Sequence, residues 1–430
     1  MSRRHNRHKI HLINLVSLPP TGRIVQLFLS RQLLNFSAMI FFVSIADAIM
    51  SYVVPIAIEE HVSSTFMMGL VFSFSSVVGF ASDFILAKIF RYKHHHFFLK
   101  MFFLTAVIFP LTFLLPHKNV ITLLLAMGIW GIYYEFGGFS KFQFVKEKMM
   151  VADHAISWGV LSTFSSLAYA FGPILASFML NQSENSPFYL VLVLLCVGFL
   201  IYYPQLYKNR HKHLSLPQEE TKMSTSGEIK IWLTLLKKVW PIYLFFTIIV
   251  IIDSCFWSVG TLLSEQLKAQ HPWGGFLLTI HMLPPLFIGF LIPLAAKPVG
   301  KKRAAFISAL ISGVFLTIAG FTTNIPLFLG FILISSIASS ISFPEIYAVF
   351  EDYIARLGDH KVDMIGLQGS ASSLAYVIGP IVSGALATFF GNQFTFSIMG
   401  GLLVITSIIM LLIVPKKIKM PQQELLQIEQ

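Results

Sequence analysis

Charged residues and cysteines are both scarce in this 430-residue sequence. Only 12% of the residues are charged and 55% are hydrophobic, whereas about 25% of the residues of a soluble globular chain are charged. The two cysteines, Cys196 and Cys255, both lie in apolar stretches. They therefore provide neither a disulfide framework nor a four-ligand metal site. These shortages argue against a soluble enzyme or binding module and indicate a protein whose main solvent is a lipid bilayer.

Long apolar runs fill most of the chain. A helix that crosses the hydrocarbon core of a bilayer needs about 20 apolar residues. We find twelve such runs and therefore predict an all-α membrane protein with twelve transmembrane helices. The runs cover residues 36–58, 66–86, 97–116, 120–143, 157–180, 187–206, 240–263, 273–296, 305–323, 326–350, 364–390 and 392–415.

Polar and charged segments divide these runs into two groups of six. The longest internal segment is rich in charge, serine and threonine, which is typical of a linker. The predicted parts are a basic N-terminus with an interfacial segment (1–35), a first bundle (36–207), a linker (208–238), a second bundle (239–415) and a tail (416–430).

Basic residues are concentrated on one side of the predicted membrane. The formal net charge is +11, but nucleic-acid binding would need a basic face on a soluble domain, and here the basic residues lie between apolar runs. They cluster at residues 3–9, 88–93, 146–148, 208–210, 301–303 and 416–417, all on one side if twelve spans are counted. Since lysine and arginine favour cytoplasmic loops, we expect both termini in the cytoplasm. We also expect the cell (plasma) membrane as the location, the lipid bilayer as a partner and no nucleic-acid partner.

A ten-residue segment occurs twice, once in each half. SSLAYAFGPI at residues 165–174 and SSLAYVIGPI at residues 372–381 agree at eight of ten positions. Small residues allow helices to approach closely, and a proline weakens the helical hydrogen bonds locally. We therefore predict two six-helix repeats with equivalent bends and tight seams. The hinge and packing residues would be Gly159, Gly172, Pro173, Gly366, Gly379 and Pro380.

Four acidic residues lie well inside apolar runs, at matching places in the two halves. Asp47 corresponds to Asp253, and Glu135 corresponds to Glu345. An ionised carboxylate inside a membrane costs several kcal/mol unless it is paired, protonated or facing water. Duplication alone gives no reason to keep such costly groups, so we interpret the four as cavity residues for proton or substrate coupling. A buried hydrogen-bonded brace is the alternative.

The Gly-Pro pattern resembles the antiporter motif of the major facilitator superfamily, and is closest to drug:proton antiporters. In both halves a glycine is followed nine positions later by a small residue, and four positions after that by a Gly-Pro pair. The loop after the second span resembles that superfamily's signature, which implies a cytoplasmic gate made by Gly79, Asp83, Lys88 and Arg91. The fourth span lacks the arginine that many proton-coupled members carry near Tyr133.

Further candidates come from the apolar runs themselves. His281 could relay protons or simply hydrogen-bond a neighbouring group. Trp130, Tyr133, Tyr134 and Trp257 could form an aromatic pocket or could pack against lipid and core. Glu265, at the outer end of a span, is expected to be solvated.

The resulting functional prediction is a secondary active transporter with a small-molecule substrate. It would be a monomer that exports small cationic or amphipathic solutes in exchange for protons. A proton-coupled symporter for a nutrient or metabolite is the alternative. A channel and an integral membrane enzyme are the two rival classes of protein. Since the sequence shows no nucleotide-binding loop, metal-ligand spacing or catalytic triad, we predict a protein that is not an enzyme and uses no metal and no cofactor.

Overall fold

The computed structural model describes residues 31–90, 93–116, 119–150, 153–208, 225–288 and 300–415, together with a few tail residues between 418 and 425. The helices of the first half are α3 (Arg31–Val62), α4 (Thr65–Ile89), α5 (His95–Phe113), α6 (Val120–Lys148), α7 (His154–Leu180) and α8 (Ser186–Lys208). Those of the second half are α9 (Thr225–Trp257), α10 (Val259–Gln270), η2 (Pro272–Phe276), α11 (Leu277–Met282), α12 (Pro284–Ile288), α14 (Lys301–Ala319), α15 (Ile325–Ile354), η3 (Gly358–His360), α16 (Lys361–Phe390) and α17 (Asn392–Ile413).

Among these described residues, 11 helices are long and apolar enough to cross a membrane. The predicted run 273–296 is not one of them. Its described part is divided into η2, α11 and α12, where Pro272 and Pro284 begin new helical segments. Residues 289–299 lie outside the described part, so a twelfth span stays a prediction.

Side-chain caps mark several helix starts. Asn119 accepts a hydrogen bond from the backbone N–H of Thr122 at 2.9 Å, and Thr122 returns one to the backbone N–H of Asn119, which completes a capping box at the start of α6. Asn324 accepts from the N–H of Leu327 at the start of α15. These polar residues satisfy amide groups that the first helical turn leaves without partners.

α9 begins earlier than the apolar pattern indicates, inside the segment predicted as the linker 208–238. Ile231, Leu235 and Val239 recur every four residues and are fully or almost fully buried. That spacing is an apolar helix face, which the charges and hydroxyl residues of the segment obscure. α9 therefore extends into the segment predicted as the linker. The limits of the two bundles stay a prediction.

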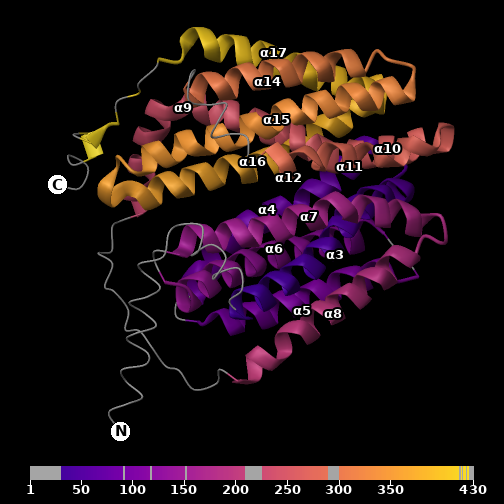
Figure 1. Cartoon of the computed structure of the whole chain (residues 1–430), viewed down its shortest axis with the longest axis horizontal. Coiled ribbons are helices and arrows are strands. Elements are labelled where there is room, and N and C mark those ends of the chain that lie inside the picture. Colours follow the sequence, from indigo (N-terminus) through magenta and orange to yellow (C-terminus); the bar gives the residue numbers. More distant parts are fainter. Residues whose placement is uncertain are drawn as a thin grey trace.

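The helices of each half pack mainly among themselves. In the first half α3 packs against α7 and α8, and α6 packs against α4 and α5; in the second half α9 packs against α16, and α14 packs against α15 and α17. Figure 1 shows the two groups side by side, the first from indigo to magenta and the second from salmon to yellow. Across the division α4 packs along α16, and α7 packs against α11.

The repeated Gly-Pro segments make equivalent seams. A methyl group at Gly172 on α7 would overlap Ala48 on α3, and one at Gly379 on α16 would overlap Ser254 on α9. Gly366 also faces a close neighbour, because a methyl group there would lie 2.7 Å from the ring of Trp232. By contrast, a methyl group at Gly159 would meet nothing within 4 Å. Three of these four glycines thus permit close helix contact.

Candidate functional site

A cavity of about 620 Å³ lies between the two halves. Both halves contribute to its wall, mainly through α4, α6, α9, α15 and α16. The lining side chains are largely aromatic or hydroxyl-bearing, with few ionisable groups. They are Ser51, Phe72, Ser75, Ser76, Gly79, Phe80, Trp130, Gly131, Tyr134, Glu135, Tyr169, Asp253, Trp257, His281, Met282, Pro285, Ser336, Ser339, Ser340, Phe343, Pro344, Ser372, Ser373 and Tyr376.

Asp253 lies at the second-half side of the cavity and is held by two neighbours. Tyr376 donates its hydroxyl proton to Oδ2 of Asp253 at 2.6 Å, and Nε2 of His281 lies 3.4 Å from Oδ1. The other ring nitrogen of His281 is 3.0 Å from the hydroxyl oxygen of Ser336. His281 is also stacked on Phe256, with ring centroids 3.7 Å apart. A carboxylate and an imidazole are thereby held in one orientation beside the cavity, with 20% of the Asp253 side chain exposed.

Asp47 is the first-half counterpart, but it does not line the cavity. Its carboxylate accepts hydrogen bonds from three aromatic donors: Nε1 of Trp130 at 3.3 Å, the hydroxyl of Tyr134 at 3.1 Å, and the hydroxyl of Tyr169. Only 6% of Asp47 is exposed. The cavity wall at this point consists of the three aromatic rings, and the carboxylate lies behind them.

The repeated segment explains why both aspartates have a tyrosine partner. Tyr169 and Tyr376 occupy the same place in the two SSLAY sequences, and each donates to the aspartate of its own half. This Asp-Tyr pair is therefore duplicated together with the Gly-Pro seam. The repeat itself indicates this pair, because the tyrosine is one of the eight residues that the two copies share.

The two glutamates are placed differently from each other. Glu135 lines the cavity, and its carboxylate makes no hydrogen bond or ion pair to the described residues. Glu345 is 2% exposed and is not among the lining residues. Its Oε2 atom is buried and has no hydrogen-bond partner in the described part of the chain. The structure thus brings Glu135 and Asp253 to the cavity wall, and leaves Asp47 and Glu345 behind it.

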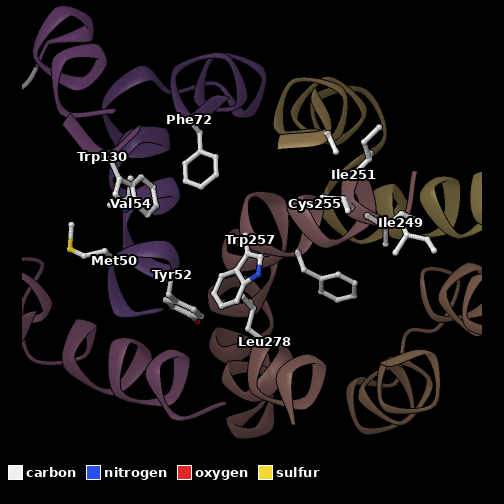
Figure 2. Packing of buried hydrophobic residues seen from close by; sticks show 14 of the residues in the cluster. Met50, Tyr52, Val54, Phe72, Trp130, Ile249, Ile251, Cys255, Trp257 and Leu278 are labelled. Carbon is white, nitrogen blue, oxygen red and sulfur yellow. The ribbon is translucent and has the colours of Figure 1, made fainter. Parts of the chain in front are cut away.

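Three of the four predicted aromatic residues line the cavity, namely Trp130, Tyr134 and Trp257. The fourth, Tyr133, instead stacks on Phe102 inside the first half, with centroids 4.8 Å apart. Trp257 approaches the other half, because its ring centroid lies 5.5 Å from that of Tyr169. Figure 2 shows Trp257 between the second-half helices and the first-half residues Tyr52 and Phe72.

Hydrogen bonds join the two halves about two helical turns beyond the cavity-lining residues Tyr169 and Trp257, and we call this region the closed end of the cavity. Glu265 on α10 accepts from the hydroxyls of Tyr52 on α3 and Ser177 on α7, both at 2.7 Å. Lys268 forms an ion pair with Glu265 at 3.1 Å and donates to the carbonyl oxygen of Ser177 at 2.7 Å. The expectation that Glu265 is merely solvated is therefore wrong. Its hydroxyl partners, Tyr52 and Ser177, come from helices distant in sequence, so no local pattern indicated them.

The predicted cytoplasmic gate is only partly described. Gly79 lines the cavity and packs against α6, where a methyl group would lie 3.5 Å from the carbonyl oxygen of Gly131. Asp83 is exposed near the end of α4. The side chain of Lys88 and the whole of Arg91 lie outside the described residues, so the gate stays a prediction.

The architecture described above is that of major facilitator transporters. Residues 248–426, which are less than half of the chain, match the family model of the Major Facilitator Superfamily. Solved structures extend this likeness to nearly the whole chain. Together they confirm the predicted fold class, an all-α membrane protein of major facilitator type.

Three solved structures illustrate the likeness. A POT family transporter in complex with a thioalcohol-conjugated peptide has a TM-score of 0.71 at 12% identity, covering 90% of this chain and 96% of that one. A bacterial homologue of the human lysosomal transporter Spinster, in an inward-facing and unoccupied conformation, has a TM-score of 0.69 at 14% identity and covers 88% and 95%. The nucleoside transporter NupG has a TM-score of 0.66 at 12% identity and covers 90% and 100%. A comparison with curated protein sequences finds no match.

Proposed function

We propose that this protein is a secondary transporter that works by alternating access and exports small cationic or amphipathic solutes in exchange for protons. One observation carries the proposal: a cavity of about 620 Å³ between duplicated halves is lined by Asp253 and Glu135, and by no lysine or arginine among the described residues. A cavity of this size accommodates a small organic molecule. When ionised, these two carboxylates favour a cation.

The closed end supports alternating access. Tyr52 and Ser177 of the first half hold Glu265 of the second, so the halves are joined beyond one end of the cavity. With both termini in the cytoplasm, as the basic loops indicate, this closed end faces outward. Opening it while the opposite end closes would carry a bound solute across the membrane.

Asp253 supports coupling to protons. The same carboxylate can hold either a proton or a cationic solute, but protonation removes the charge that attracts the solute. The two ligands therefore compete, and this negative coupling is the thermodynamic basis of exchange. His281 beside Asp253 supplies a second group able to take up or release a proton.

The test uses purified protein in liposomes with three probes: benzylguanidinium, benzyltrimethylammonium and the neutral nucleoside uridine. Exchange predicts saturable accumulation of at least one cation when the lumen is acidic, and loss of this accumulation when nigericin collapses the pH gradient in potassium buffer. Protein-free liposomes provide the background. Absence of saturable, gradient-driven flux for all three probes would count against the proposal.

Replacements at the acids test the coupling mechanism. Single variants Asp47→Asn, Glu135→Gln, Asp253→Asn and Glu345→Gln should impair pH-driven transport at one or more positions. If all four leave it intact, the acidic residues do not couple transport to protons, even if the protein transports.

Proton-coupled symport of a nutrient or metabolite is the second candidate. It is favoured by the likeness to structures that include a nucleoside transporter and a peptide-bound POT family transporter. The direction of the pH gradient that drives accumulation distinguishes symport from exchange. Symport predicts accumulation of uridine when the external medium is acidic, whereas exchange predicts accumulation of a cation when the lumen is acidic.

A further inference from the structure

The polar groups around the cavity are unevenly divided between donors and acceptors of hydrogen bonds. The lining contains eight serines, but no lysine, arginine, asparagine or glutamine among the described residues. What the wall offers to a solute therefore depends on where the serine and tyrosine protons point. A hydroxyl has one proton to donate and two lone pairs that accept.

Several cavity serines donate their proton to their own helix. Ser75 donates to the carbonyl oxygen of Phe72 at 2.9 Å, Ser340 to that of Ser336 at 2.7 Å, and Ser373 to that of Gly369 at 3.3 Å. A serine bound in this way has no proton left for a solute. Its oxygen presents only lone pairs, and the side chain acts as an acceptor.

The aromatic donors are also occupied. Tyr376 donates to Asp253, whereas Trp130, Tyr134 and Tyr169 donate to Asp47 behind the wall. Asp47 thereby draws three donors away from the cavity while contributing no surface to it. The hydroxyl oxygens of the tyrosines are left as acceptors, like those of the serines.

The two carboxylates at the wall add acceptors, which carry negative charge when they are ionised. Asp253 is partly exposed, and Glu135 has no hydrogen-bond partner among the described residues. The indole N–H of Trp257 and the hydroxyl of Ser76 are exceptions, since neither has a hydrogen-bond partner in the described part of the chain and both could donate to a solute. The balance nevertheless remains strongly on the side of acceptors and negative charge.

We propose that the cavity selects organic cations that carry N–H groups, such as ammonium or guanidinium ions on an aromatic body, over quaternary ammonium ions and anions. This rests on the proposed transport function and specifies its substrate class. Charge alone would attract both kinds of cation. Only an N–H cation satisfies the acceptors that binding removes from water, while aromatic residues such as Phe72 and Trp130 contact its apolar body.

The test compares benzylguanidinium with benzyltrimethylammonium, using the full-length protein in nanodiscs and isothermal titration calorimetry. Both ions keep their charge near neutral pH and share the benzyl group, but only the first has N–H donors. A buried site built for hydrogen bonding disfavours a ligand without the matching group, so we expect benzylguanidinium to bind at least about tenfold more tightly. Benzoate, the anionic control, should bind more weakly than either.

Ser340→Ala tests the acceptor role without changing the charge. It should weaken benzylguanidinium binding about three- to tenfold and leave benzyltrimethylammonium binding unchanged. Ser308→Ala is the matched control: Ser308 is also 6% exposed and also donates to the carbonyl oxygen four residues before it, but it does not line the cavity. It should change neither affinity.

Equal or tighter binding of benzyltrimethylammonium, tighter binding of benzoate, or no binding of either cation would overturn the proposed selectivity. So would an equal loss for both cations in Ser340→Ala. These outcomes are separate from failure of the transport function. Saturable, gradient-driven flux of uridine or benzyltrimethylammonium would show that the protein transports, although its cavity does not select N–H cations.

Discussion

Replacing Glu265 by glutamine should loosen the closed end of the cavity. The variant keeps the size of the side chain and one acceptor oxygen but removes the charge. In the structure this carboxylate accepts from Tyr52 and Ser177, both at 2.7 Å and both on the opposite half. Lys268 also crosses between the halves, to the carbonyl oxygen of Ser177 at 2.7 Å, but Glu265 is the group that accepts from two helices of the first half, so this position tests the closure.

The magnitude follows from the two hydrogen bonds that Glu265 accepts from the opposite half. A hydrogen bond to a charged group contributes about 1.5–3 kcal/mol and a neutral one about 0.5–1.5 kcal/mol. Two weakened bonds would cost about 2 kcal/mol if fully shielded from water. Since 26% of the Glu265 side chain is exposed, we expect about 1–2 kcal/mol after screening. At about 1.4 kcal/mol per factor of ten, the closed-end state should lose roughly five- to thirtyfold in population relative to the open one.

Spin labels on either side of the closed end would measure this change. His61→Cys near the end of α3 and Ala269→Cys on α10 are both exposed positions, and Cys196→Ser would remove an exposed native thiol. Double electron–electron resonance should show a larger fraction of long distances with Glu265→Gln than without it.

The control is Glu59→Gln, near the same end of α3. The Glu59 side chain makes no hydrogen bond to the described residues, so its neutralisation should leave the distances unchanged. Identical distributions with and without Glu265→Gln would refute the closure, as would an equal shift in Glu59→Gln.

Two further predictions compare positions that the repeat makes equivalent or that the motif groups together. Asp47→Asn leaves three buried donors facing one acceptor oxygen and an amide, so it should lower the free energy of unfolding by about 1–3 kcal/mol. Asp253→Asn should mainly weaken benzylguanidinium binding. Thermal unfolding and calorimetry on both variants would show this difference, and equal losses of stability would contradict it. Gly379→Ala should destabilise by about 1–3 kcal/mol because the added methyl group overlaps Ser254, while Gly159→Ala should be neutral, and an equal fall in melting temperature for both would rule out the proposed seam.

Most of the helical architecture could be predicted from local sequence. Eleven of the described helices are long and apolar enough to span a membrane, because in a bilayer each span must satisfy its own backbone hydrogen bonds and be apolar over about 20 residues. The prediction was weaker where this rule is broken. The early start of α9 lies in a polar segment, and prolines divide the described part of the run 273–296 into short helices.

The duplication also indicated part of the site. Equivalent positions of Gly172 and Gly379 in the two repeats predicted equivalent seams, and the structure places them against α3 and α9. The same repeat contains Tyr169 and Tyr376, which donate to the two aspartates. A segment that occurs twice can be recognised in the sequence even when the residues that it contacts lie on a distant helix.

The sequence by itself determined that this chain builds apolar helices, that its halves repeat, and that costly carboxylates lie within them. Only the tertiary structure decided what each carboxylate faces. Asp47 and Asp253 are equivalent in sequence, yet three aromatic donors cover the first and the cavity reaches the second. Glu265 likewise joins the halves through Tyr52 and Ser177. Burial and hydrogen bonding of a side chain are set by neighbours from distant segments, and local composition does not indicate which segments will be in contact.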